Sequence, residues 1–177
     1  MANRDIVAIG TSAGGVEALL SVTRQLPQAF PASILITIHL PSHSRSSLDE
    51  ILARAGRLPA AFATDGAILR KGRIYIAPPG HHLLAQGERL ALGVGPRENN
   101  ARPAIDAMFR SVALCCGSRT IGVVLTGTLG DGAAGLWAIK EAGGIAIVQD
   151  PKEAAFPEMP RAALNHVEPD YLAQLSE

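Results

Sequence analysis

Hydrophobic positions along this chain fall into two alternating patterns. Short, continuously apolar runs are typical of strands buried on both faces of a sheet, and they occupy residues 6–10, 33–38, 121–125 and 145–149. Between them, apolar residues three or four positions apart predict helices over residues 14–24, 46–55, 104–114 and 133–142. This alternation predicts a doubly wound α/β fold, with a mostly parallel sheet and helices on both faces.

The middle of the chain departs from this rhythm. Residues 72–77 predict one more strand, and residues 82–85 and 89–94 predict the two arms of an inserted β-hairpin. A polar loop rich in arginine and asparagine follows at 96–103, and helical segments are expected to finish the chain after a proline-rich loop at 150–160. The sequence has no repeat or low-complexity linker, so we expect one domain over residues 1–177.

Composition narrows the classes of function. Hydrophobic residues make up 47% of the 177 residues and charged residues 18%, which is typical of a globular chain. A net charge of zero and an aromatic content of 4% argue against a nucleic-acid-binding surface. No apolar run approaches the roughly 20 residues of a membrane span, and no signal peptide precedes the first strand. We therefore expect a cytoplasmic protein without membrane insertion, and the composition leaves its oligomeric state open.

The most informative motif is Gly10-Thr11-Ser12-Ala13-Gly14-Gly15, which joins the first predicted strand to the first predicted helix. A G-x-S-x-G pattern between a strand and a helix is typical of a nucleophile elbow, a sharp turn that exposes the serine hydroxyl. Backbone N–H groups at the start of such a helix can face a developing oxyanion. The motif therefore makes Ser12 a candidate nucleophile.

Two further candidates follow other predicted strands. His39 comes directly after residues 33–38, and Asp131 lies in the loop after residues 121–125. Because sites in open α/β sheets lie at the carboxyl ends of the parallel strands, Ser12, His39 and Asp131 are expected to converge as nucleophile, base and orienting acid. Each also has a structural alternative: Ser12 as a helix N-cap, His39 as a buried core histidine, and Asp131 as the cap of the helix at 133–142.

Other kinds of site find less support. The segment from Gly10 to Gly15 lacks the middle glycine of a dinucleotide-binding loop, and His39 stands where that site expects an acidic residue. The adjacent Cys115 and Cys116 have no C-x-x-C spacing, and no histidine–carboxylate cluster has zinc-ligand spacing, so we expect neither a metal nor a cofactor. The order serine, histidine, aspartate also differs from that of the α/β-hydrolases.

Several segments together resemble the catalytic domain of the chemotaxis protein-glutamate methylesterases, the CheB family. The resemblance runs from about residue 5 to the C-terminal region, and its order and spacing are more specific than the elbow alone. The segments that carry it are Ile9-Gly10-Thr11-Ser12-Ala13-Gly14-Gly15, Ile38-His39-Leu40-Pro41, Tyr75-Ile76-Ala77-Pro78, Arg102-Pro103-Ala104-Ile105-Asp106-Ala107-Met108-Phe109, Leu125-Thr126-Gly127, Asp131-Gly132-Ala133-Ala134-Gly135-Leu136 and Met159-Pro160-Arg161.

The resemblance implies an activity and a partner. Members of the family remove methyl groups from methylated glutamates on the cytoplasmic helices of chemoreceptors, releasing methanol, and some deamidate receptor glutamines. It places a catalytic triad on Ser12, His39 and Asp131, and it implies no cofactor. The backbone N–H groups of Ala13 and Thr128 are expected to hold the oxyanion, although many members have other side chains there.

Four more residues are candidates for lining the site. His43 follows His39 closely in the sequence and is expected at the entrance to the site. The resemblance adds Met159 as a further site-lining residue. Arg102 and Arg161 are expected to line the site or contact the partner, the alternative being structural ion pairs or carbonyl caps. Typical members also carry a receiver domain, which these 177 residues lack, so we expect a stand-alone esterase or part of a longer protein. Two other functions stay open: a general small-ester hydrolase, and a non-catalytic signalling or scaffold module.

Overall fold

The central sheet is built outward in both directions from its first strand. The computed structural model describes residues 4–40 and 46–176, and its sheet has seven strands in the order β3-β4-β2-β1-β7-β8-β9. Every neighbouring pair is parallel. The strands are β1 (Ile6–Thr11), β2 (Ser33–Ile38), β3 (Ala60–Phe62), β4 (Arg73–Ile76), β7 (Thr120–Val124), β8 (Ile145–Gln149) and β9 (Tyr171–Ala173). The strand order reverses between β1 and β7, which makes this the topological switch point.

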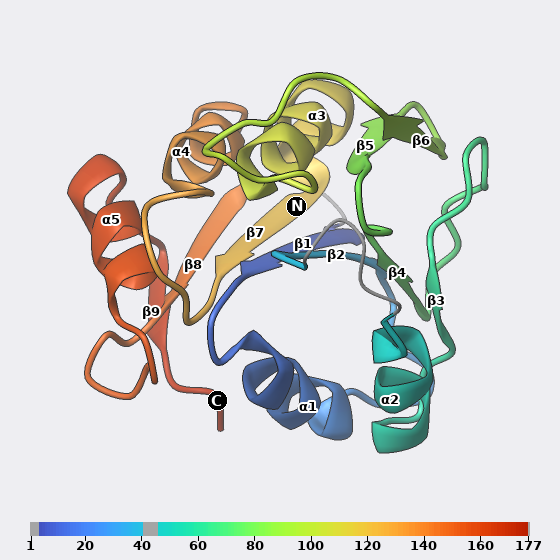
Figure 1. Ribbon diagram of the computed structural model, residues 1–177, viewed down its shortest axis with the longest axis horizontal. Helices are drawn as coiled ribbons and strands as arrows, with labels where there is room; N and C mark the ends of the chain where they lie inside the picture. The colour runs from blue at the N-terminus through green and yellow to red at the C-terminus, as the bar shows by residue number, and fades with distance from the viewer. Residues whose placement is uncertain (1–3, 41–45, 177) are drawn as a thin grey trace.

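Helices cover both faces of the sheet, as the hydrophobic pattern predicts (Figure 1). One face carries α1 (Gly15–Gln25) and α2 (Leu48–Ala55), and the other carries α3 (Ile105–Cys116), α4 (Ala133–Glu141) and α5 (Glu158–His166). A 3₁₀ turn, Gly117–Arg119, links α3 to β7. Each helical layer packs on its own hydrophobic cluster. Strand β2 is buried along its whole length, whereas alternate residues of β7 are only partly buried. The expected doubly wound α/β fold is confirmed.

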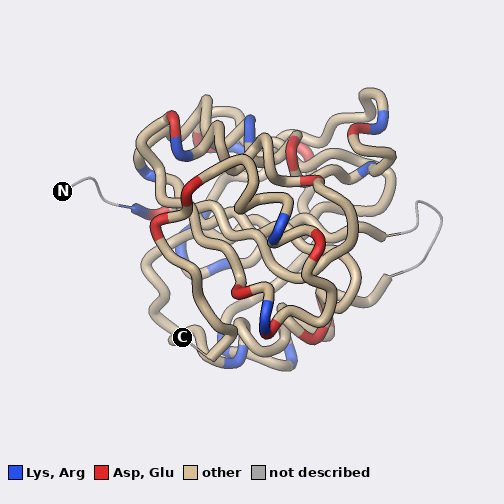
Figure 2. The backbone as a smooth tube through the Cα atoms, turned by 90° about the vertical axis from the view of Figure 1, so that its left-hand side faces the viewer, with Lys and Arg blue, Asp and Glu red and all other residues tan. Residues whose placement is uncertain are grey.

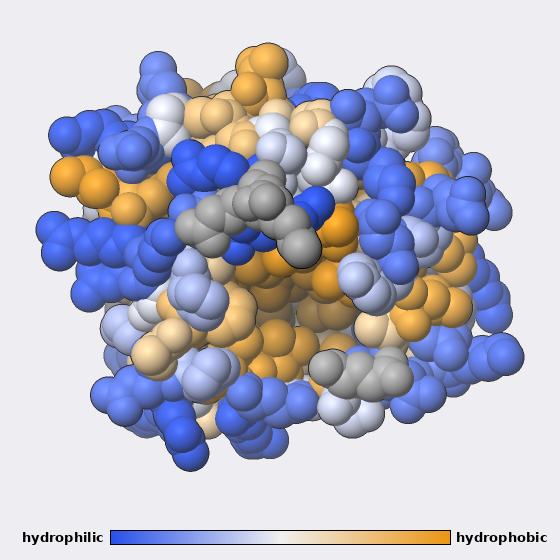
Figure 3. Space-filling view, turned by 180° about the vertical axis from the view of Figure 1, so that it is seen from behind, coloured by the Kyte–Doolittle hydropathy of each residue, from blue (hydrophilic) through white to orange (hydrophobic). Residues whose placement is uncertain are grey.

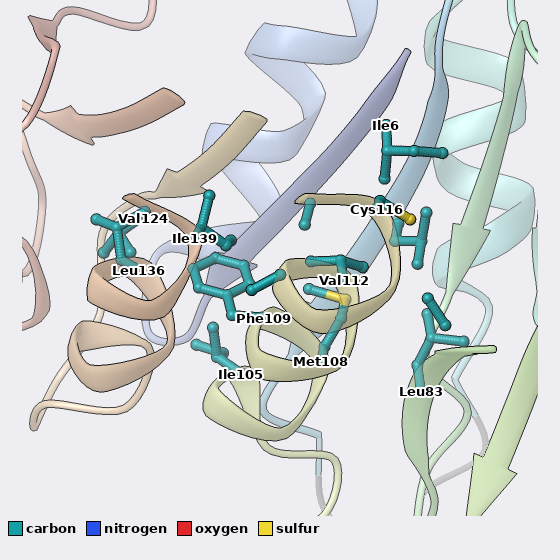
Figure 4. Packing of buried hydrophobic residues seen from close by; sticks show 14 of the residues in the cluster. Ile6, Leu83, Ile105, Met108, Phe109, Val112, Cys116, Val124, Leu136 and Ile139 are labelled. Carbon is teal, nitrogen blue, oxygen red and sulfur yellow. The ribbon is translucent and has the colours of Figure 1, made fainter. Parts of the chain in front are cut away.

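The cluster beneath α3 and α4 shows why these segments are helical. Ile105, Phe109 and Val112 recur along α3 at helical spacing, Leu136 and Ile139 lie on α4, and the Phe109 ring points toward Ile139 (Figure 4). All five side chains are fully buried. Burial of one such side chain stabilises the fold by about 1.5–3 kcal/mol. This packing holds the N-terminal end of α3 at a fixed place beside the carboxyl ends of the strands.

The inserted hairpin is also confirmed. Strands β5 (His82–Gln86) and β6 (Arg89–Gly93) pair antiparallel outside the main sheet, and β5 packs against α3, where the Ser111 hydroxyl accepts a hydrogen bond from the Ala85 N–H at 3.0 Å. Two elements of the sheet were not predicted: the edge strands β3 and β9, which have three residues each. Such runs are too short to show a period, and β9 lies where helical segments were expected; α5 supplies the helix there.

The charged residues of the surface do not separate by sign. Lysine, arginine, aspartate and glutamate are interspersed along the chain, with both signs on the same face (Figure 2).

Within residues 4–40 and 46–176, no helix is long and apolar enough to cross a membrane. An apolar hollow of about 790 Å³ opens between the end of α1 and strands β7 to β9, and its walls include Leu26, Phe30, Val123 and Ile147 (Figure 3).

Candidate functional site

Strand register brings the predicted residues to one edge of the sheet. In the β1–β2 pair Thr11 lies beside Ile38, so the next residues along the two strands, Ser12 and His39, are neighbours; the His39 N–H donates to the Thr11 carbonyl at 3.4 Å. On the other side of β1, the Ser12 N–H donates to the Thr126 carbonyl at 3.1 Å. The loop that carries Asp131 therefore starts next to Ser12, at the switch point.

The turn at Ser12 has the geometry expected of an elbow. Strand β1 ends at Thr11, and α1 begins at Gly15 after Gly14, whose φ of 72° is a left-handed conformation that glycine adopts without strain. The Thr11 hydroxyl donates to the Thr126 carbonyl at 2.7 Å, which fixes the turn against the neighbouring loop. Gly14, and not Ser12, is the N-cap of α1, and no side chain in the described part of the chain forms a cap hydrogen bond there. The structural alternative for Ser12 is therefore wrong.

Asp131 is buried, with 1% of its side chain exposed, and its two carboxylate oxygens accept four hydrogen bonds. Its Oδ2 accepts from His39 Nε2 at 2.7 Å and from the Ile105 N–H at 2.7 Å. Its Oδ1 accepts from Asn99 Nδ2 at 2.7 Å and from the Asp106 N–H at 3.0 Å. This carboxylate is therefore held by the N-terminus of α3, where the helix dipole favours a negative charge.

These contacts decide the charge of Asp131. Burial pushes the pKa of Asp131 upward, but the hydrogen bonds from His39 and from the backbone of Asp106 and Ile105 outweigh burial, so its pKa lies below the ordinary value of 3.8. Asp131 is thus an anion at neutral pH. The structural alternative, in which Asp131 caps the helix at 133–142, is wrong, since the N-cap of α4 is Gly132 and Asp131 accepts from the N-terminus of α3 instead.

His39 lies between the buried Asp131 carboxylate and the solvent. Its side chain is 22% exposed, and with Nε2 bonded to Asp131 its Nδ1 is the nitrogen left for a second partner. In the serine-protease template the two nitrogens are used the other way round. Among the described residues, no hydrogen bond joins the Ser12 hydroxyl to this imidazole; catalytic hydrogen bonds of this kind often tighten only around a substrate.

The loop after β7 packs tightly against Ser12. A Cβ added at Gly127 would lie 2.9 Å from the Ser12 Cβ and 2.6 Å from the Met159 Cε, so only glycine fits between them. Thr128, the next residue, is exposed. Over residues 4–40 and 46–176, neither the Ala13 N–H nor the Thr128 N–H donates a hydrogen bond, which leaves both free for an external oxygen.

The remaining candidates lie at different depths. Met159 is 1% exposed and packs beneath Gly127, and Arg161 is exposed on α5. Arg102 donates through Nη1 to the carbonyl oxygens of Val94 (3.1 Å) and Gly95 (2.8 Å), as its structural alternative expects. Partner contacts for both arginines stay predictions, and His43 lies outside the described residues.

Two residues beside Asp131 were not predicted as part of the site. Asn99 and Asp106 form a hydrogen-bonded chain with Asp131. Asn99 lies in the loop at 96–103, for which the sequence predicted only a polar character. The consecutive asparagines 99 and 100 are the signal for a tight turn with positive φ. Within the described part of the chain, no three histidine, cysteine or acidic side chains form a group that could hold a metal ion.

Comparison with known proteins places this chain in a family. Residues 7–177 match the family model of the CheB methylesterase. The chain belongs to the CheB methylesterase family. The crystal structure of the Thermotoga maritima CheB methylesterase catalytic domain is similar to this CheB-family chain, with a TM-score of 0.92, 33% identity, and coverage of 99% of this chain and 95% of that one.

Curated relatives of this CheB-family chain differ in length. A Leptospira interrogans relative is 36% identical over 176 residues, which are 99% of this chain and 91% of that one. The Caulobacter vibrioides protein-glutamate methylesterase/protein-glutamine glutaminase 1 is 40% identical over 167 residues, 92% of this chain but 48% of that protein. The chain thus spans most of one relative and about half of the other.

Proposed function

We propose that this chain is a serine hydrolase that removes methyl groups from glutamate methyl esters on the cytoplasmic helices of chemoreceptors, in the cytoplasm, and that it deamidates receptor glutamines. The observation that carries the proposal is the 2.7 Å hydrogen bond between His39 and the buried Asp131, directly beside Ser12. Membership of the CheB methylesterase family supports the substrate class, and relatives bear the names of both activities.

The first half of the reaction forms an acyl-enzyme. His39 Nδ1 takes the proton of the Ser12 hydroxyl as its oxygen attacks the carbonyl carbon of the methyl ester. Asp131, bonded to Nε2, fixes the tautomer that leaves Nδ1 unprotonated and stabilises the imidazolium once it forms. The N–H groups of Ala13 and Thr128 donate to the tetrahedral oxyanion. His39 then protonates the methoxide leaving group, and methanol departs.

The second half releases the free glutamate. Water gives a proton to His39 Nδ1 as it attacks the acyl-enzyme, and the same nitrogen returns a proton to Ser12 as the carboxylic acid leaves. Deamidation follows the same route with ammonia as the leaving group. Residues 1–177 act as one catalytic domain in this proposal.

The test is methanol release from methylated chemoreceptor membranes. Ser12→Ala removes the nucleophile, and we expect turnover to fall by about 10⁴–10⁶-fold, as in other triads. Ser118→Ala is the matched control, because Ser118 is exposed and lies at the opposite end of β7. Its turnover should equal that of the unsubstituted chain.

Each alternative function has its own outcome. Fast cleavage of p-nitrophenyl esters together with no methanol from receptors would indicate a general small-ester hydrolase. Receptor binding that survives Ser12→Ala, with no methanol from the unsubstituted chain, would indicate a non-catalytic module. A Ser12→Ala variant that keeps more than a tenth of the turnover would remove Ser12 from the nucleophile's role.

A further inference from the structure

One side-chain amide joins two buried carboxylates next to the site. Asn99 Nδ2 lies 2.7 Å from Asp131 Oδ1 and 2.8 Å from Asp106 Oδ2. Asp131 is 1% exposed and Asp106 6%. Because an amide nitrogen carries two protons, each carboxylate receives one of them, and the donor capacity of Asn99 is fully used.

Asp106 determines how this amide is oriented. Its other oxygen, Oδ1, accepts the Gly135 N–H at 2.6 Å, which fixes Asp106 between α3 and α4. Asn99 therefore faces two fixed carboxylate oxygens. If its amide were turned over, its carbonyl oxygen would meet both of them, so only the observed orientation is favourable. Burial and the charge of Asp131 raise the pKa of Asp106, as expected for carboxylates in one network.

The backbone also selects asparagine at this position. Asn99 and Asn100 have φ values of 49° and 61°, and Glu98 and Ala101 exchange both backbone hydrogen bonds, at 3.1 and 2.8 Å. Two central residues with positive φ define a type I′ turn, in which asparagine and glycine are favoured. Turn geometry alone would explain both asparagines, but the side chain of Asn99 is the one that bonds Asp131.

The loop that carries Asn99 is anchored on both sides of the turn. Arg110 forms an ion pair with Glu98 at 2.5 Å. His82 Nε2 donates to the Pro96 carbonyl at 2.9 Å, and its Nδ1 accepts the Ala104 N–H at 3.2 Å. These contacts tie the loop to the hairpin and to α3. Asn99 is thus presented to Asp131 from a fixed backbone.

We propose that Asn99 and Asp106 are positioning residues for the catalytic carboxylate: Asp106 orients the Asn99 amide, and that amide holds Asp131 Oδ1 so that Oδ2 points at His39. This inference rests on the proposed function, in which Asp131 acts on His39. The proposed reaction assigns neither residue a contact with the ester, so in this proposal both act through Asp131. Losing them should therefore lower kcat without changing substrate binding.

The first experiment distinguishes the effect of the Asn99 amide on kcat from the effect of the turn conformation. Asn99→Gly keeps a residue that accepts positive φ and removes the amide, and Asn100→Gly is the matched control in the same turn. We expect Asn99→Gly to lower kcat by about tenfold, the scale of one hydrogen bond to a charged group, with KM within about twofold. Asn100→Gly should leave both constants unchanged. Equal constants for the two variants would overturn the proposal.

A double-mutant cycle tests whether Asp106 acts through Asn99. Asp106→Asn retains an oxygen for the Gly135 N–H but turns an amide nitrogen toward Asn99, which then loses its orientation. We expect Asp106→Asn to lower kcat about as much as Asn99→Gly, and the double variant to lose no more than either single variant. Losses that multiply would show that the two residues act independently, against the proposal.

A spectroscopic readout keeps this inference distinct from the proposed function. The proton between His39 Nε2 and Asp131 should give a downfield proton NMR signal in the unsubstituted chain. That signal should shift or broaden in Asn99→Gly and stay in place in Asn100→Gly, whether or not methanol is released. An unmoved signal in Asn99→Gly would overturn the positioning role, whereas absent methanol with the expected shift would overturn only the proposed function.

Discussion

Asp131→Asn is the substitution whose outcome the geometry specifies most closely. Asparagine has one side-chain acceptor and one NH₂ group, whereas the carboxylate it replaces accepts two hydrogen bonds on each oxygen. With the new NH₂ on the Oδ1 side, it would meet two donors that cannot adapt: Asn99 Nδ2, held by Asp106, and the Asp106 N–H. That orientation leaves two hydrogen bonds lost.

The opposite orientation loses only one fixed contact. With the NH₂ on the Oδ2 side, the Ile105 N–H loses its acceptor, but the imidazole can change tautomer and accept through Nε2. One buried donor without a partner costs about 1–3 kcal/mol, against twice that for the first orientation. The favoured orientation therefore leaves the proton on His39 Nδ1, where it blocks transfer from Ser12. We expect kcat to fall by about 10⁴-fold, as for the same substitution in other triads.

The assay pairs methanol release with urea unfolding of the same variant. We expect the large loss in kcat together with a decrease of only about 1–3 kcal/mol in the free energy of unfolding at pH 7. Because the folded pKa of Asp131 is lowered, its charge stabilises the fold fully above 3.8 and this contribution is lost as the pH falls through the folded value. The stability difference should therefore shrink in acid. A loss in kcat of less than tenfold would refute the tautomer argument.

Two further predictions use other contacts. Gly127→Ala places a methyl group 2.9 Å from the Ser12 Cβ and should lower kcat by about 10–100-fold. Gly130→Ala is the control in the same loop: its added methyl group lies 3.3 Å from the nearest atom, and kcat should stay unchanged. Equal kcat values for the two variants would show that the loop moves to accept the methyl group. Asp5→Asn should lower the urea midpoint at pH 7, because the hydrogen bond from Arg119, with Lys71, lowers the Asp5 pKa against the effect of burial. The difference in urea midpoint between the variant and the unsubstituted chain should vanish as the pH falls below 3.8 and through the lowered pKa of Asp5 in the folded chain. A midpoint difference that persists in acid would contradict the stabilising role of the Asp5 charge.

Most of the fold was predictable because its signals are local. The apolar runs of β1, β2, β7 and β8 are long enough to predict strands, and Gly14 marks the turn into α1. The meeting of Ser12, His39 and the loop of Asp131 follows from topology, since the carboxyl ends of parallel strands share one edge. The two edge strands, β3 and β9, are too short for any periodic signal.

The surroundings of Asp131 were not predictable in the same way. Its carboxylate binds the N-terminus of α3, which lies 25 and 26 residues before it in the chain, and not the helix that follows it. No local rule distinguishes these two helices, because the choice depends on how α3 and α4 pack on the sheet. Asn99 carries a turn signal, but its contact with Asp131 depends on the same packing.

The apolar hollow beside α1 affects how variants of this protein can be compared. Fluorescent dyes such as ANS brighten on exposed hydrophobic surface, and here that surface exists in the folded chain, along Leu26, Phe30, Val123 and Ile147. A dye-based melting curve would begin from a high signal and obscure the transition. Circular dichroism reports the helices directly and is the better measure of whether a substituted chain is still folded.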